Sequence, residues 1–165
     1  MSTKKQNLSA LDTEKVPSGK GKKVAIVVSE WNNDITFALR DGAVQTLKKH
    51  GVAVKDIFVE LVPGSVELTF AAKMVCENYE PDAVITLGCV VQGETPHFDY
   101  VCQSVTYGIT ELNLSYEVPF IFGVLTVNTQ QQAIDRAGGK HGNKGVECAV
   151  AALKMMALVD KVDQG

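Results

Sequence analysis

The sequence lacks the features that mark secreted, membrane-spanning or nucleic-acid-binding proteins. Its four cysteines include no Cys-x-x-Cys pair, and its three histidines include no pair at zinc-ligand spacing, which argues against a disulfide framework and a structural zinc site. No apolar run has the length of a signal peptide or a membrane span. Away from the amino terminus, neither the 16 basic nor the 19 acidic side chains gather into a block, so nucleic acid is not an expected partner. We expect a soluble, cytoplasmic protein with reduced thiols.

What the sequence does contain is enough apolar material for one domain. Of its 165 residues, 45% are apolar and 21% are charged, proportions typical of a single globular core. Residues 1–22 are polar and include Pro17, Gly19 and Gly21, a composition typical of an arm or linker. We therefore expect an amino-terminal arm over residues 1–22 and one α/β domain over residues 23–165.

Buried strands and amphipathic helices alternate along this domain. In the first predicted helix, apolar residues recur four apart from Ile35 to Leu47, between the candidate cap Asn33 and the stop Gly51, so one helix face is apolar. The same alternation predicts strands at 24–28, 54–61, 83–87 and 120–126, and helices at 34–50, 65–79, 96–116, 129–136 and 144–162.

Strands separated by helices of this length indicate a parallel sheet, because each connection must cross over one face of the sheet. The expected fold is a three-layer α/β/α sandwich with a four-stranded parallel sheet, of the flavodoxin-like type. Such folds bind ligands beyond the carboxyl ends of their strands. Here those ends are the segments 30–33, 62–67, 88–97 and 126–130.

A phosphate-binding helix start is indicated by GETPH, residues 93–97, after the third predicted strand. Thr95 suits an N-cap and Pro96 the first helical position, so the free backbone N–H groups before them would bind an anion. His97, in the first helical turn, is placed for proton transfer. The simpler alternatives are a capped helix without a ligand and a surface histidine that is hydrogen-bonded locally.

Trp31 and Glu67 also fall at predicted strand ends. Trp31 is the only tryptophan and is followed by two asparagines, a group suited to stacking on a heteroaromatic ring; a partly buried core ring is the alternative. Glu67 suits hydrogen bonds from a polyol, although a carboxylate in the first turn also simply favours the helix dipole. His50, beside Gly51, is explained as a cation at a helix C-terminus and is left out of the site.

The segment 135–145, DRAGGKHGNKG, is rich in glycine and cations. Its basic residues, Arg136, Lys140, His141 and Lys144, suit an anion. The segment lacks the strand context and spacing of a nucleotide-binding fingerprint, and a solvated turn is the alternative.

In their order along the chain, five segments of this sequence resemble the lumazine synthase family over residues 22–162: EWNN, VPGSVELTFAAK, LGCVVQGETPHFDYV, FIFGVLT and DRAGGKHGNKG. The motifs G-E-T-x-H-F-D-Y and A-G-x-K-x-G-N-K-G are specific to that family. The resemblance implies a transferase of riboflavin biosynthesis. Such an enzyme catalyses the penultimate step of that pathway. It condenses 5-amino-6-(D-ribitylamino)uracil with 3,4-dihydroxy-2-butanone 4-phosphate to 6,7-dimethyl-8-ribityllumazine, without metal or cofactor.

The resemblance also implies roles for the matching residues. His97 would be the catalytic proton-transfer residue, and Glu94, Thr95 and Arg136 would bind the phosphate. Phe122 would reach the site from a neighbouring subunit. The ribitylaminouracil would be bound by Trp31, Asn32, Ser65, Val66, Glu67, Cys89, Val90, Val91, Phe122 and Lys144.

Two positions depart from the common pattern of the family. Val66 replaces a frequent aromatic residue, and Gln92 replaces a frequent basic one. The turn 138–144 is uninterrupted, as in members that form shells, so the resemblance implies pentamers that close into a 60-subunit icosahedral capsid, with riboflavin synthase as a candidate partner.

Two other functions remain open from the residues alone. One is a flavin or nucleotide carrier with a flavodoxin-like fold and no catalysis. The other is a scaffold whose assembly is its function, although the presence of Trp31, Glu67, His97 and Arg136 argues against a degenerate site.

Overall fold

The computed structural model describes residues 15–163, and its elements follow the predicted alternation. In chain order they are β1 (Val24–Ser29), α1 (Asn33–Lys49), the 3₁₀ turn η2 (Val54–Asp56), β2 (Ile57–Val62), α2 (Glu67–Tyr79), β3 (Ala83–Val91), α3 (His97–Ser115), β4 (Phe120–Val127), α4 (Gln130–Arg136), β5 (Ala137–Gly139), β6 (Gly142–Asn143) and α5 (Lys144–Asp163).

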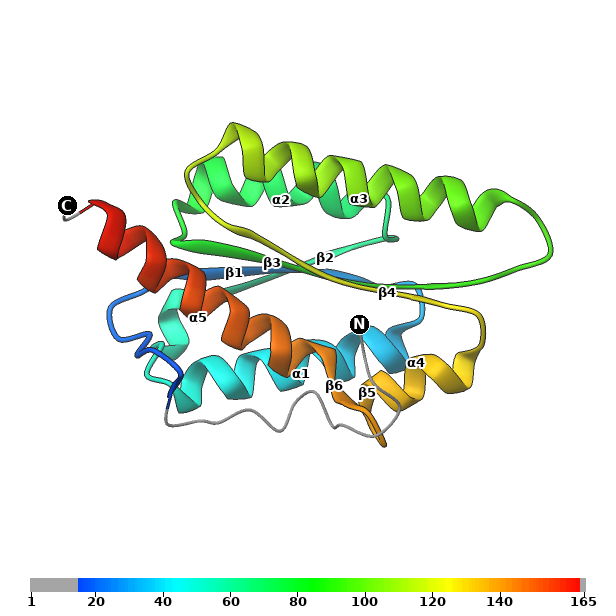
Figure 1. The fold of residues 1–165 in the computed structure, drawn as a ribbon, viewed down its shortest axis with the longest axis horizontal. Coiled ribbons are helices and arrows are strands. Elements are labelled where there is room, and N and C mark those ends of the chain that lie inside the picture. The colour runs from blue at the N-terminus through cyan, green and yellow to red at the C-terminus, as the bar shows by residue number, and fades with distance from the viewer. Residues whose placement is uncertain (1–14, 164–165) are drawn as a thin grey trace.

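A four-stranded sheet of order β2-β1-β3-β4 lies at the centre of the fold, and all its neighbouring strands are parallel. Helices α2 and α3 cover one face, and α1, α4 and α5 cover the other (Figure 1). The predicted three-layer, flavodoxin-like α/β/α sandwich is therefore confirmed. The strand order reverses its direction between β1 and β3, which is where such sheets open a ligand crevice.

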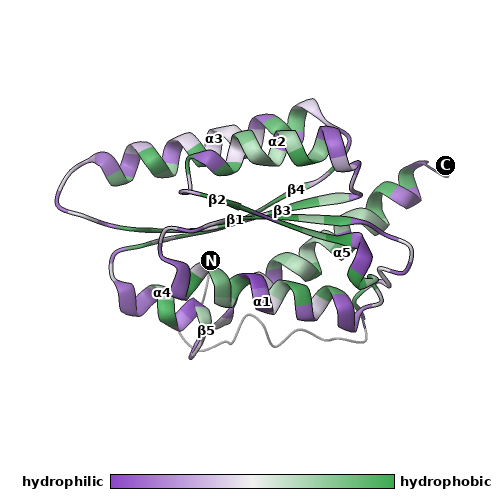
Figure 2. Ribbon diagram, turned by 180° about the vertical axis from the view of Figure 1, so that it is seen from behind, coloured by the Kyte–Doolittle hydropathy of each residue, from purple (hydrophilic) through white to green (hydrophobic). Residues whose placement is uncertain are grey.

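The core consists of two apolar layers, one on each face of the sheet. Along β1, Ile26 packs with the α1 and α5 side, whereas Ala25 and Val27 pack with the α2 and α3 side. All six β1 residues are buried, which explains the continuous apolar run of this strand. The helices turn their apolar faces inward and their polar faces outward (Figure 2). Burial of one large aliphatic side chain contributes about 1.5–3 kcal/mol.

Two predicted strand boundaries were wrong by more than one residue. The strand predicted at 54–61 begins only at Ile57, because residues 54–56 form a 3₁₀ turn. The strand predicted to end at Leu87 continues to Val91, because β4 pairs with β3 as far as Val91 and Val127. Gly88 does not end the strand. Its missing Cβ makes room for Ser65, whose Oγ would lie 2.8 Å from such an atom.

The segment predicted as a glycine-rich loop contains regular structure. Residues 137–139 and 142–143 pair as a short antiparallel hairpin. Gly138 and Gly142 adopt φ values of 113° and 83°, a region that favours glycine. Those glycines therefore shape a tight connection between α4 and α5, which sequence alone did not reveal.

Residues 16–22 lie against the domain. The Gly19 amide donates to the His50 carbonyl at 2.7 Å, and Val16 packs against the core. Lys22 forms ion pairs with Asp160 at 2.6 Å and Asp82 at 3.5 Å, which together raise its pKa. Most of the predicted arm, residues 1–14, lies outside the described residues. Between residues 15 and 163, no helix is long and apolar enough to cross a membrane.

Candidate active site

A cleft of about 390 Å³ opens at the carboxyl ends of β1, β2 and β3. This position agrees with the crevice expected for a sheet of this order. The cleft is lined by Trp31, Asn32, Gly64, Ser65, Val66, Glu67, Cys89, Val90, Val91, Gly93, Thr95, His97, Phe98 and Val101. All but four of the predicted site residues are in this set.

The loop after β1 presents Trp31 to the cleft. The Trp31 amide donates to the Pro63 carbonyl at 3.1 Å, so the loop stays tied to the chain beyond β2. Asn32 has φ 59° and is the N-cap of α1, so the prediction of Asn33 as the cap was wrong. Asparagine is one of the few residues that tolerate this conformation. The Asn32 Nδ2 donates to the Cys89 carbonyl at 3.0 Å, and the Trp31 ring remains 73% exposed.

The connection between β2 and α2 forms the second wall. Ser65 is buried and Val66 is exposed, and Glu67 begins α2 with its side chain exposed. A Cβ at Gly64 would lie 3.0 Å from Glu67 Oε2, so this carboxylate bends back over the turn. The wall therefore offers a hydroxyl, backbone groups and a carboxylate to a ligand rich in hydroxyl groups.

The end of β3 forms the floor, and it can offer backbone but no reactive thiol. Cys89 is only 2% exposed, and burial raises the pKa of its thiol to about 11. The thiol is therefore protonated at neutral pH and is not a nucleophile. Val90 and Val91 are half-buried beside it.

The start of α3 closes the cleft. The helix begins at His97 with Pro96 at the N-cap position and no side-chain cap, so the prediction of Thr95 as the cap was wrong. The Pro96 carbonyl accepts from the Asp99 amide at 2.9 Å, so the first turn closes without a hydrogen bond from the Thr95 side chain. The Thr95 side chain therefore lines the cleft instead. A 19-residue helix places partial positive charge here, beside the exposed imidazole of His97.

Four residues of the cleft were not among the predicted site residues: Gly64, Gly93, Phe98 and Val101. Gly64 and Gly93 do lie within the predicted ligand-binding segments 62–67 and 88–97, whereas Phe98 and Val101 were missed. Val101 is half-buried and lines the cleft. The spacing carried a usable signal, because residues four apart share a helix face. Val101 therefore follows His97 on one side of α3.

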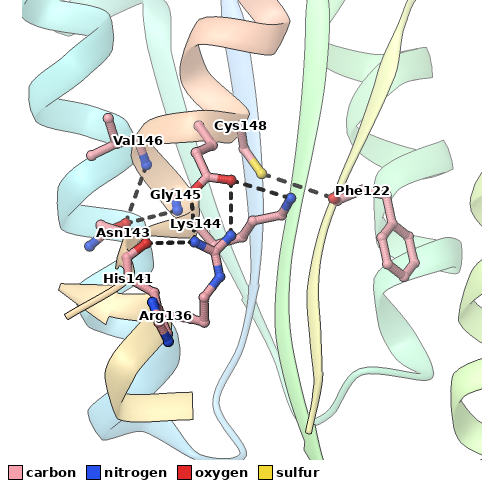
Figure 3. A network of polar contacts seen from close by, with 9 residues as sticks. Phe122, Arg136, His141, Asn143, Lys144, Gly145, Val146 and Cys148 are labelled. Atoms are coloured by element: carbon pink, nitrogen blue, oxygen red, sulfur yellow. Dashed lines mark hydrogen bonds and ion pairs between the residues drawn. The ribbon is translucent and has the colours of Figure 1, made fainter. Parts of the chain in front are cut away.

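Four predicted site residues do not line this cleft: Glu94, Phe122, Arg136 and Lys144. Glu94 is exposed in the loop before α3. Phe122, on the edge strand β4, packs against the apolar layer next to α2 and α3. Its ring points away from Arg136 and Lys144 (Figure 3).

Arg136, His141, Asn143, Lys144 and Glu147 form a second site, which we call the Arg136 cluster (Figure 3). Arg136 Nη1 and Nη2 donate to Glu147 Oε1 and Oε2 at 2.8 and 2.9 Å, and Nη1 also donates to the His141 carbonyl at 2.8 Å. Lys144 Nζ lies 3.6 Å from Glu147 Oε2. The ions are 31% exposed or less, so the cluster is charged, ordered and partly screened from water.

Asn143 fastens this cluster to α1. Its Oδ1 accepts from the Gly145 and Val146 amides at 2.8 and 3.2 Å, which caps α5. Its Nδ2 donates to the Ala38 carbonyl at 2.9 Å. A Cβ at Gly42 would lie 2.6 Å from the Asn143 side-chain oxygen, and a Cβ at Gly145 would collide with the Leu39 carbonyl. Gly42 and the last glycine of G-N-K-G are therefore explained by the close approach of α1 and α5.

The two sites differ in charge. No lysine or arginine is among the described residues that line the cleft, so an anion there meets only His97 and the start of α3. Chemically, the cleft suits a flat polar ring beside Trp31, a polyol beside Ser65 and Glu67, and proton transfer by His97. Within residues 15–163, no group of three His, Cys, Asp or Glu side chains is arranged to hold a metal ion.

Comparison with known proteins places this geometry in one family. A family model described as 6,7-dimethyl-8-ribityllumazine synthase matches residues 21–160. A protein of that name from Parabacteroides distasonis is 60% identical over 156 residues, which cover 94% of this chain and 98% of the relative. Another, from Porphyromonas gingivalis, is 57% identical over 158 residues, covering 96% of this chain and 98% of the relative.

Proposed function

The chain belongs to the 6,7-dimethyl-8-ribityllumazine synthase family, and we propose that its cleft is the place where this reaction occurs. The enzyme condenses 5-amino-6-(D-ribitylamino)uracil with 3,4-dihydroxy-2-butanone 4-phosphate and releases phosphate and water. The observation that carries the assignment of the site is that one cleft gathers Trp31, Ser65, Glu67 and His97 at the sheet's ligand edge.

In the proposed binding mode, the uracil ring stacks on Trp31, and its edge meets backbone of residues 89–91. The ribityl chain bonds to Ser65 and Glu67, with Asn32 and Val66 completing the walls. A stacked base contributes about 1–3 kcal/mol to binding. The phosphate lies at the start of α3 beside Thr95, with Glu94 in the adjoining loop.

The reactants carry much of the reactivity themselves. The arylamine attacks the ketone and a first water leaves as the imine forms. Elimination of phosphate then leaves a second carbonyl, and the ribitylamine nitrogen attacks this carbonyl and closes the ring with loss of a second water. Binding both reactants in one pose contributes up to about 7–11 kcal/mol in favourable systems. His97 moves the protons of imine formation and elimination, because it begins α3 where the phosphate would be bound.

We further propose that each cleft is completed by a neighbouring subunit. The cleft has no cationic side chain from Lys or Arg within the described chain, whereas Arg136 and Lys144 lie in a separate cluster. Phe122 lies on the edge strand β4. A head-to-tail contact that repeats around an axis closes into a ring, so Phe122 and the Arg136 cluster of one subunit would face the cleft of the next in a pentamer.

The assembly would extend to a capsid of 60 subunits. The hairpin β5–β6 makes a short connection between α4 and α5, and an insertion there would alter how neighbouring pentamers approach. Light scattering tests this directly, since particles of only pentamer mass across a range of phosphate concentration and pH would contradict the capsid.

Three further features belong to this proposal. Residues 23–165 would form the catalytic domain and residues 1–22 an arm, whose last part, residues 16–22, lies against that domain. The protein would act in the cytoplasm, in keeping with unpaired Cys76, Cys89, Cys102 and Cys148, as thiols persist where disulfides are reduced. Riboflavin synthase, which consumes the product, is the proposed protein partner.

A direct assay tests the function. Purified protein mixed with both substrates should yield lumazine, followed by its absorbance and fluorescence. Stoichiometric binding of a flavin or lumazine without turnover would instead indicate a carrier, and the absence of both would indicate a scaffold.

A further inference from the structure

Glu147, which no sequence motif singled out, lies at the centre of the Arg136 cluster. Its two carboxylate oxygens accept from Arg136 at 2.8 and 2.9 Å, and Lys144 Nζ lies 3.6 Å away. The Glu147 side chain is 16% exposed and that of Arg136 is 18% exposed. A two-point pair of this kind fixes the plane of the guanidinium as well as its position.

Within residues 15–163, these contacts leave one edge of the Arg136 guanidinium without a partner. The Nη1–Nη2 edge is taken by Glu147, and the second Nη1 proton is taken by the His141 carbonyl. The remaining donors are Nε–H and the second Nη2–H, which lie parallel on one edge of the planar group. Such a pair of parallel donors matches two oxygens of a phosphate.

Glu147 has two opposing effects on an anion at this cluster. Its charge offsets one of the two cations, Arg136 and Lys144, and so weakens the attraction for phosphate at a distance. Its hydrogen bonds hold Arg136 in one orientation, so less conformational freedom is lost when phosphate binds. The two effects predict opposite results when the charge of Glu147 is removed.

We propose that Glu147 is a positioning residue, which holds Arg136 with its Nε–Nη2 edge toward the substrate phosphate in the neighbouring subunit's cleft. This inference rests on the proposed function, in which Arg136 binds that phosphate. Glu147 itself touches no substrate and acts through Arg136, and its orienting effect outweighs the charge that it removes.

The experiment measures inorganic phosphate as a competitive inhibitor against the phosphorylated substrate, together with the KM of each substrate. Three variants of the full chain are compared: Glu147→Gln, Arg136→Ala, and Glu111→Gln as a matched loss of an exposed carboxylate on α3. Light scattering checks that each variant assembles like the parent protein.

Glu147→Gln should raise the inhibition constant of phosphate and the KM of the phosphorylated substrate about tenfold, the effect of losing one charge-assisted hydrogen bond. The KM of the uracil should stay unchanged, which a general structural defect would not produce. Glu111→Gln should have the same phosphate inhibition constant and KM values as the parent protein. Unchanged or tighter phosphate binding in Glu147→Gln would overturn the inference, because the charge effect alone predicts tighter binding.

Arg136→Ala distinguishes failure of the positioning role of Glu147 from failure of the proposed phosphate site. If Arg136→Ala weakens phosphate binding while Glu147→Gln does not, only the positioning role fails. If Arg136→Ala leaves phosphate binding unchanged, the proposed phosphate site itself fails, and the inference falls with it. Should Glu147→Gln not assemble, Glu147→Asp replaces it, since it keeps the charge but shortens the reach, and it is judged by the same expected and overturning results.

Discussion

The cleft and the Arg136 cluster differ in how far their polar side chains are exposed and bonded to one another. In the cleft, Trp31 is 73% exposed and the side chains of Glu67 and His97 are also exposed, so groups that can bind a ligand face solvent. In the cluster, the side chains of Arg136 and Glu147 are at most 18% exposed and bond to each other. One region offers open binding capacity, and the other holds charge in a fixed geometry.

In the proposed pentamer, this difference would give neighbouring subunits different roles in substrate binding. In the proposed site, the cleft would determine which ring and polyol bind, because it is lined by the segments that follow β1, β2 and β3 and by the start of α3. The cluster would determine how the phosphate is held, because Glu147 already orients Arg136. Substitutions in the two regions should therefore change different kinetic constants.

The largest effect on turnover is expected at His97. The His97→Ala variant should lower kcat by about 10²-fold or less, the low end for general acid–base catalysis, because the reactants themselves are reactive. The protein should still fold, because the side chain is exposed. Steady-state kinetics tests this, with His50→Ala at the end of α1 as the matched control that leaves kcat unchanged. Equal rates for His97→Ala and the parent protein would remove His97 from the mechanism.

An intermediate effect is expected at Trp31. The Trp31→Ala variant should raise the KM of the uracil substrate about tenfold, because base stacking contributes about 1–3 kcal/mol to binding. The KM of the phosphorylated substrate should stay unchanged. The melting temperature of the variant should stay close to the parent value, since the ring is largely exposed. As a control, Val162→Ala shortens another exposed apolar side chain, at the end of α5. It should leave the KM of both substrates unchanged. Equal weakening of both substrates by Trp31→Ala would argue against stacking.

The smallest effect is expected at Cys89. Its pKa of about 11 keeps the thiol protonated at pH 8, because a thiol forms thiolate only as the pH approaches its pKa. Alkylation with iodoacetamide at pH 8 should therefore leave activity intact. Cys89→Ala should stay within about twofold of the parent kcat, because the contact with Asn32 is made by the Cys89 backbone carbonyl, which the substitution keeps. Rapid inactivation that the alanine variant escapes would contradict this.

The sequence predicted the cleft better than the cluster, for a physical reason. Strand and helix periodicity is local, and once a parallel sheet is inferred, the carboxyl ends of the strands must meet at one edge. Trp31, Glu67 and His97 were therefore placed together correctly in space. Periodicity did not reveal that β3 extends past Gly88, since that depends on pairing with β4.

The Arg136 cluster depends on contacts that local patterns do not encode. The pair between Arg136 and Glu147 spans the β5–β6 hairpin and eleven positions of sequence. Asn143 reaches across 105 positions to Ala38. Such partners emerge only when α1, α4 and α5 pack together, so the glycine-rich segment could be interpreted as an anion-binding loop or a solvated turn, but not as an ordered ion-pair cluster.

The central claim is that a complete site needs the cleft of one subunit and the cluster of another, and co-assembly of two damaged chains tests it most directly. His97→Ala damages the cleft and Arg136→Ala damages the cluster, so each homo-oligomer should be slow. Co-expressed in equal amounts, they should regain activity in about a quarter of the sites, where an intact cleft meets an intact cluster across a head-to-tail interface. A mixture of His97→Ala and Trp31→Ala, both damaged in the cleft, should show no such recovery. Activity of the first mixture equal to the mean of its two homo-oligomers would contradict the shared site.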